Sequence, residues 1–182
     1  LKQPIAPSID VIKARQKATW EDGNYASFAK FMEAGAIEIL NNWKIAKDLT
    51  LLDVGCGSGQ TAIPAAKNGI KVTGVDIAEN LIQHARKRAQ EAGLEIRFDV
   101  GDAEDMPYAN NSFDVVISLI GAMFAPRPEL VASEFARVLK SGGKLFMANW
   151  TAASMPAKMF KCLSGFVPPP PGLVPPVLWG DE

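Results

Sequence analysis

The chain has 182 residues, which is enough for one domain with a sizeable hydrophobic core. Hydrophobic residues make up 48% and charged residues 21%, as in an ordinary soluble globular protein, and the formal net charge is only −1. This charge creates no general attraction to nucleic acid or an anionic membrane, and the longest apolar stretch, residues 117–125, is too short to cross a bilayer. We therefore expect no nucleic-acid or membrane partner and a cytoplasmic location.

The first 44 residues precede the first expected strand, and we expect them to form a helical lid or cap. They contain a helix-like stretch at residues 26–43, behind the segment Trp20-Glu21-Asp22-Gly23-Asn24-Tyr25. Residues 45–150 carry the pattern of an α/β core. Residues 151–182 are rich in proline, which cannot donate a hydrogen bond inside a sheet, so no further strand is expected there.

The most informative segment of the core is residues 51–60, LLDVGCGSGQ. An apolar run ends in Asp53, three glycines follow at alternate positions, and a helix-compatible segment comes next. A Rossmann-like sheet receives a nucleotide-like ligand through this strand, glycine loop and helix. A dinucleotide fingerprint would place its third glycine at position 60, which holds Gln60. A tight turn that merely caps a strand is the structural alternative.

The second expected strand, residues 71–77, also ends in an acid. Asp76 lies 21 residues after Gly55, close to the roughly 20-residue spacing of a ribose-binding acid. A carboxylate suits this role because it accepts hydrogen bonds from two neighbouring ribose hydroxyls. The structural alternative is an aspartate that caps a helix or a turn.

The remaining elements continue the alternation of helix and strand. We expect a helix at 79–92, a strand at 96–100, a nearly apolar central strand at 113–119, a helix at 129–140, a glycine turn at 141–143 and a fifth strand at 144–150. Strands that alternate with helices pair in parallel through right-handed crossovers. The sequence thus predicts a doubly wound, Rossmann-like α/β fold, with a mostly parallel sheet and helices on both faces.

Six segments resemble motifs of class I S-adenosylmethionine-dependent methyltransferases, and they fall in the order that this family has. They are residues 53–59 (DVGCGSG), 75–77 (VDI), 101–104 (GDAE), 106–108 (MPY), 112–116 (SFDVV) and 137–143 (RVLKSGG). The resemblance covers residues 45–150 and implies S-adenosylmethionine as methyl donor, with S-adenosylhomocysteine as product. Family members commonly add two strands after the fifth, so we expect the C-terminal strands to be missing and the chain to be truncated.

The resemblance also implies which residues bind the cofactor. Around its methionine and ribose parts lie Asp53, Gly55, Cys56, Gly57, Gly59 and Asp76. Around its adenine lie Ile77, Asp102, Ala103 and Glu104. At the mouth of the site lie Ser118 and Gly121, and Tyr25 reaches the cofactor from the lid. The structural alternatives are a turn at Gly101-Asp102 and a buried aromatic residue at Tyr25.

The sequence assigns no catalytic residue. Methyl transfer is an in-line displacement, for which alignment in a dry pocket supplies much of the rate. The single histidine, His84, falls within the helix at 79–92, away from the expected mouth, and Cys56 has no paired base. No Cys/His cluster has the spacing of metal ligands, so no metal is expected. Residues 121–126 and Asn149-Trp150 line the acceptor pocket or belong to the core.

The near-neutral charge and the apolar mouth favour a small-molecule methyl acceptor. Methylation of tRNA or rRNA is the alternative acceptor class, and a methyltransferase-like module that holds the cofactor without transferring a methyl group is a further alternative. A nicotinamide-dependent oxidoreductase is disfavoured by Gln60 and by the lack of a Tyr-x-x-x-Lys pair. The sequence indicates no oligomeric state.

Overall fold

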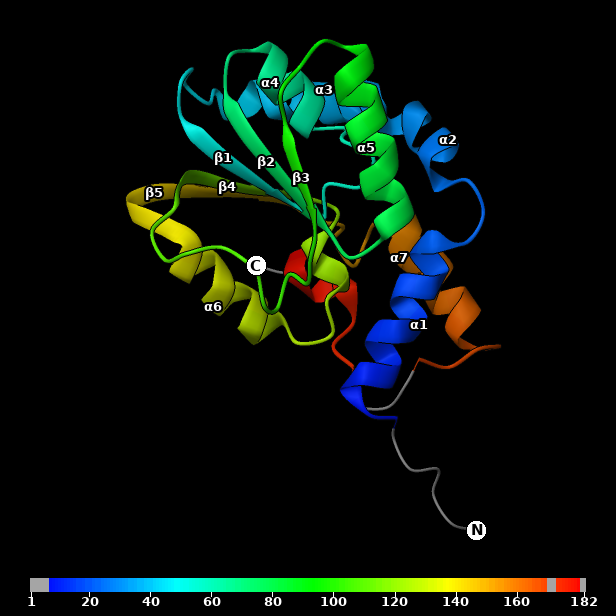
Figure 1. The fold of residues 1–182 in the computed structure, drawn as a ribbon. Helices are drawn as coiled ribbons and strands as arrows, with labels where there is room; N and C mark the ends of the chain where they lie inside the picture. The colour runs from blue at the N-terminus through cyan, green and yellow to red at the C-terminus, as the bar shows by residue number, and fades with distance from the viewer. Residues whose placement is uncertain (1–6, 170–172, 181–182) are drawn as a thin grey trace.

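A computed structural model describes residues 7–169 and 173–180, and its core is a five-stranded parallel sheet with helices on both faces (Figure 1). The strands are β1 (Thr50–Val54), β2 (Lys71–Asp76), β3 (Arg97–Val100), β4 (Phe113–Leu119) and β5 (Leu139–Ala148). They lie in the order β3-β2-β1-β4-β5, and every neighbouring pair is parallel. The predicted Rossmann-like α/β architecture is confirmed, and strand order reverses between β1 and β4.

The sheet is the middle of three layers. Leu51 and Leu52 are neighbours in β1, both are fully buried, and they point to opposite faces because side chains alternate along a strand. Leu51 packs in a cluster with α3 (Glu33–Trp43), α4 (Ala62–Lys67) and α5 (Glu79–Glu91). Leu52 packs on the other face with α6 (Pro128–Val138). A strand buried on both faces needs a continuous apolar run, which is what these positions provide.

The region between α6 and β5 differs from the prediction. The helix expected at 129–140 ends at Val138, and β5 begins at once at Leu139. Gly142 and Gly143 lie inside this strand, where the pairing shifts from Phe113 with Leu139 to Val115 with Lys144. Gly142 has a φ of +77°, which glycine adopts without strain, so the two glycines form a bulge in a strand instead of a turn before one.

Other boundaries shift for local reasons. The helix expected at 26–43 is divided into α2 (Tyr25–Ala29), the 3-10 turn η1 (Lys30–Met32) and α3. β5 ends at Ala148, so Asn149 and Trp150 follow the strand and do not belong to it.

The N-terminal helix α1 (Ile9–Glu21) lies on the side of the sheet toward which the strands point (Figure 1). It begins after Ser8, whose side chain accepts a hydrogen bond from the Val11 backbone N–H. After β4 comes the 3-10 turn η2 (Ala122–Phe124), and after β5 come α7 (Met155–Ser164) and η3 (Pro176–Gly180).

Residues 149–169 and 173–180 contain no strand. The middle of the proline-rich run, residues 170–172, lies outside the described part. None of the helices within the described ranges has both the length and the apolar character needed to span a membrane.

Candidate functional site

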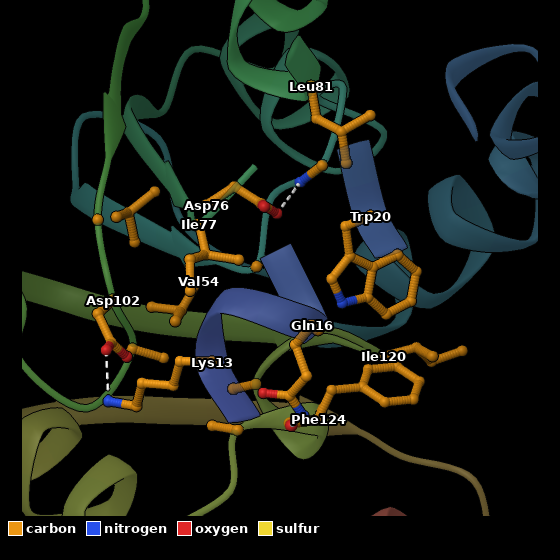
Figure 2. Close-up of a pocket in the computed structure, with 18 of the residues that line it drawn as sticks. Lys13, Gln16, Trp20, Val54, Asp76, Ile77, Leu81, Asp102, Ile120 and Phe124 are labelled. Atoms are coloured by element: carbon orange, nitrogen blue, oxygen red, sulfur yellow. Dashed lines mark hydrogen bonds and ion pairs between the residues drawn. The ribbon is translucent and has the colours of Figure 1, made fainter. Parts of the chain in front are cut away.

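A cavity opens at the carboxyl ends of β1, β2 and β4, and α1 lies across it (Figure 2). This is the point where the strand order reverses, the usual ligand position in an open parallel sheet. Eight of the residues predicted from the sequence line this cavity: Tyr25, Gly55, Gly57, Asp76, Ile77, Asp102, Ala103 and Gly121.

The floor of the cavity is formed where two loops touch at their backbones. A Cβ atom on Gly55 would lie only 2.6 Å from Cα of Gly121, and Gly55 has a φ of +73°. The backbone N–H of Gly55 donates to the carbonyl oxygen of Val75 at 2.8 Å, which ties the glycine loop to β2. Side chains at Gly55 or Gly121 would push the loops apart, so this glycine pair keeps backbone exposed to a ligand.

The Asp76 carboxylate both shapes the glycine loop and faces the cavity. Its Oδ2 accepts from the Gly57 N–H at 2.8 Å, and its Oδ1 accepts from the Ala78 N–H at 2.9 Å. Burial raises the pKa of Asp76, although these backbone hydrogen bonds favour its charged form. An ionised carboxylate has about four lone-pair positions, so about two remain for a ligand. Asp76 therefore also caps a turn, which was the structural alternative, and this role does not exclude ligand binding.

Asp102 lies on the opposite side of the cavity, in contact with α1. Its Oδ2 accepts from the Lys13 ammonium at 2.5 Å, and the same ammonium lies 2.5 Å from Oε2 of Glu104 (Figure 2 shows the first contact). Glu104 is buried away from the cavity and also pairs with Arg127 at 2.7 Å. Burial disfavours the Lys13 ammonium, but hydrogen bonds to both acids outweigh it and raise the pKa of Lys13. Glu104 thus anchors α1 instead of lining the cavity.

Asp53 is buried beneath the glycine loop and does not line the cavity. Its Oδ2 accepts from the Thr61 hydroxyl at 2.6 Å, whereas its Oδ1 has no hydrogen-bond partner among the described residues. Burial raises the pKa of Asp53 to about 7, and the nearby charge of Asp76 adds to this shift, while the Thr61 hydrogen bond opposes it. Contact between Asp53 and a cofactor stays a prediction.

Three other predicted residues support the site from behind. The Ser118 hydroxyl donates to the Val54 carbonyl at 2.7 Å and accepts from the Ala122 N–H at 2.9 Å, which links β1 to the loop after β4. Cys56 is buried, and burial raises the pKa of its thiol, so it stays protonated. Gly59 has a φ of +85° and turns the chain toward α4. We find none of the three in the cavity lining.

Sequence reasoning missed the contribution of α1. Lys13, Gln16 and Trp20 line the cavity, and the Gln16 side-chain amide donates to the Phe124 carbonyl at 2.8 Å. The spacing of these three residues, i, i+3 and i+7, places them on one helix face and was the available signal. Ile120 also lines the cavity, with a φ of +53° that is rare for a β-branched residue.

Four side chains in the lining carry acidic, basic or phenolic groups: Lys13, Tyr25, Asp76 and Asp102. The pKa of the Tyr25 phenol is raised by burial and by the charge of Asp76, so it stays protonated. His84 is exposed on α5 and does not line the cavity. In residues 7–169 and 173–180, no group of three or more His, Cys, Asp or Glu side chains is arranged to hold a metal ion.

Comparison with known proteins agrees with this geometry. Residues 52–147 match the family model described as "Methyltransferase domain". An uncharacterized protein of Mycobacterium tuberculosis (strain H37Rv) is 39% identical over 165 residues, which are 90% of this chain and 60% of that protein. The 27-O-demethylrifamycin SV methyltransferase of Amycolatopsis mediterranei is 39% identical over 110 residues, 59% of this chain and 40% of that enzyme.

Among solved structures, an S-adenosylmethionine-dependent methyltransferase of Thermotoga maritima superposes with a TM-score of 0.61 at 26% identity. The match covers 79% of this chain and 65% of that one. This chain spans about 60% of the length of the mycobacterial relative.

Proposed function

This chain belongs to the methyltransferase-domain family, and on that premise we propose that it binds S-adenosylmethionine under α1 and serves methyl transfer to a small organic acceptor. The observation that carries the proposal is the Asp76 carboxylate, which lines the cavity and keeps hydrogen-bond capacity after serving Gly57 and Ala78. Two adjacent hydroxyls of a ribose match that capacity.

The rest of the lining fits the other parts of this cofactor. Ile77 offers an apolar surface beside Asp76, as adenine requires, and Asp102 offers a carboxylate to an amino group. Gly55 and Gly57 present backbone without a side chain in the way. We assign these five residues, together with Tyr25 in the lining, to the cofactor.

When bound, S-adenosylmethionine supplies a methyl group on a positively charged sulfur that needs no further activation. The chain's own contribution is alignment and exclusion of water, because α1 covers the cavity and no histidine is among the residues that line it. Lys13 is held by Asp102 and Glu104, and Tyr25 stays protonated. Proximity and orientation can lower a barrier by about 7–11 kcal/mol, so alignment alone is a sufficient role.

A small acceptor is supported by the charge and by one relative. The net charge of −1 provides no general attraction for RNA. One relative is a 27-O-demethylrifamycin SV methyltransferase, named for a small organic molecule. We extend that acceptor class, and not that acceptor, to this protein.

The first test is calorimetric titration of the full-length protein with S-adenosylmethionine and S-adenosylhomocysteine, with NAD as control. The Asp76→Ala variant should bind both sulfur ligands about 5- to 150-fold more weakly, the scale of about 1–3 kcal/mol for charge-assisted hydrogen bonds. The matched control is Asp99→Ala, which removes an acid on β3, beside β2, that contacts Arg97 and Tyr108 outside the cavity.

Two results would contradict the proposal. If neither sulfur ligand binds the folded full-length protein, S-adenosylmethionine is not its cofactor. If a folded Asp76→Ala variant binds with unchanged affinity, Asp76 does not contact the ribose.

A further inference from the structure

Five aromatic rings form a continuous chain of contacts that starts in the cavity and leads out of it. Ring centroids are 5.3 Å apart for Tyr25 and Trp20, 5.1 Å for Trp20 and Phe124, 5.7 Å for Phe124 and Trp150, and 5.8 Å for Trp150 and Phe160. We call these five residues the aromatic array. They come from five separate segments: α2, α1, η2, the residues after β5, and α7.

The aromatic array is not part of the hydrophobic core. All five rings are only partly buried, whereas Phe98, Phe113 and Phe135 in the core are at most 8% exposed. Three array members, Trp20, Tyr25 and Phe124, line the cavity directly. Contiguous apolar surface that stays open to solvent next to a cavity is typical of a binding site.

The packing within the aromatic array leaves ring surface available. The interplanar angles are 80° between Trp20 and Tyr25, 67° between Trp20 and Phe124, and 84° between Phe124 and Trp150. In such edge-to-face pairs only one ring of the two uses its face for the contact. The unused faces suit a flat ring of a ligand, which stacks or packs edge-on against them.

One charge of the site acts on these rings, since the Asp76 carboxylate raises the pKa of Tyr25, and a negative charge there disfavours an anionic ligand. Asp102 and Lys13 pair with each other, and Asp76 contacts the glycine loop. The segment that carries Phe124, residues 118–126, contains no charged residue. An anionic or strongly hydrated acceptor would find no charged partner here, and its desolvation would not be compensated.

One polar group stands beside the rings. The Gln16 amide nitrogen donates to the Phe124 carbonyl at 2.8 Å, and its Oε1 accepts no hydrogen bond from the described residues. Gln16 lines the cavity, and Figure 2 shows its side chain beside Phe124. An acceptor with a hydroxyl or N–H group would donate to this oxygen and be oriented by it.

We propose that the rings of the aromatic array other than Tyr25, with Gln16, bind the methyl acceptor, and that this acceptor is an uncharged, ring-bearing molecule with a hydroxyl or N–H group. The inference rests on the proposed function, because only a cofactor bound at Asp76 in the same cavity makes a ligand on these rings a methyl acceptor. It goes further by naming the chemistry of the acceptor and the residues that select it.

The test uses full-length protein saturated with S-adenosylhomocysteine and 2-naphthol as probe, an uncharged pair of fused rings with one hydroxyl. We expect 2-naphthol to bind at least tenfold more tightly than 2-naphthoate, which is anionic at neutral pH. Phe124→Ala should weaken 2-naphthol binding at least tenfold, because it removes a ring from the cavity but keeps the carbonyl that Gln16 contacts.

The matched control is Phe31→Ala, which removes a ring from η1 that is 86% exposed and outside the aromatic array. It should leave 2-naphthol binding unchanged. If Phe124→Ala does not fold, Trp150→Leu provides the second variant, since it removes a ring of the aromatic array and preserves an apolar side chain. Trp150→Leu, at a residue outside the cavity lining, should bind S-adenosylhomocysteine within twofold of the parent protein.

The outcomes separate the two proposals. Loss of S-adenosylhomocysteine binding by the unmodified protein contradicts the proposed function. The inference about the acceptor is overturned if the protein binds S-adenosylhomocysteine but not 2-naphthol. It is also overturned if a folded variant of the aromatic array binds 2-naphthol as tightly as the parent protein does.

Discussion

At the scale of single residues, Asp53 carries the clearest electrostatic cost in the fold. It is almost fully buried, one oxygen lacks a hydrogen bond from any residue in the described ranges, and its pKa is raised to about 7. An unfolded aspartate releases its proton near pH 4. Between these two values the folded state holds more protons than the unfolded chain, so the Asp53 contribution to stability falls as pH rises.

The Asp53→Asn variant should therefore gain stability relative to the parent as pH rises from about 4 to 7. The difference in free energy of unfolding should grow toward about 4 kcal/mol, the upper limit for a shift of about three pKa units. Urea unfolding of both proteins at several pH values measures this difference in free energy. Asp22→Asn, at an exposed position, is the control and should show no such trend. A difference that is the same at every pH would contradict the burial of a protonated Asp53.

At the scale of elements, α1 is fastened by polar contacts at both ends. Near its start Lys13 reaches Asp102 and the buried Glu104. At its last residue, the Glu21 carboxylate accepts from the Glu79 N–H at 2.9 Å, at the start of α5. The N-cap residue of α5, Ala78, has no side chain for this purpose, so α1 caps α5 from outside.

Removing the Lys13 charge should loosen α1 selectively. In Lys13→Met the buried Glu104 keeps Arg127 as its one charged partner among the described residues. Amide hydrogen exchange in α1 should then accelerate at least tenfold, which corresponds to about 1.4 kcal/mol. Lys17→Met is the control on the same helix, because Lys17 makes only an exposed pair with Glu21 at 3.8 Å. Equal protection of α1 in the two variants would show that Lys13 does not fasten it.

The sequence predicted elements well where the pattern is local. Five strands alternating with helices follow from apolar runs and from helix periodicity, both of which span few residues. The end of α6 and the start of β5 were predicted wrongly because Gly142-Gly143 suits a bulge as well as a turn. A helical lid was predicted for the first 44 residues, but the contact that fixes α1 was not, since the Lys13–Asp102 pair joins residues 89 positions apart.

At the scale of the whole molecule, ligand binding and folding are linked because the cavity is made from four separate strand ends and α1. A ligand that binds only the folded state adds about 2.7 kcal/mol to its stability at 100 times Kd. For a domain of this size we expect S-adenosylhomocysteine to raise the Tm by roughly 5–10 °C and NAD to leave it unchanged. Thermal unfolding monitored by circular dichroism measures both. An equal rise with NAD would instead favour the oxidoreductase alternative.

The site was predictable in part because its residues come from the ends of parallel strands. Asp76 ends a strand, Gly55 and Asp102 closely follow strand ends, and parallel strands bring their carboxyl ends to one edge. Asp53 lies one position before Val54 and Ser118 two positions before Ile120, both of which line the cavity, yet the side chains of Asp53 and Ser118 turn into the core. Because side chains alternate along a strand, neighbouring residues point either into the cavity or into the core, and a sequence motif does not specify which of them does which.

The placement of α1 also has a consequence in time. While the contacts of Lys13 and Gln16 with the loops beyond β3 and β4 hold α1 in place, the helix hinders the exit of a molecule beneath it. The dissociation rate of the ligand then depends on how often α1 opens and not on the strength of any one contact. For the proposed reaction, we expect a burst in which the first turnover is faster than the later ones, because each later turnover must wait for S-adenosylhomocysteine to dissociate. Added salt, by screening the Lys13 ion pairs, would shorten that wait.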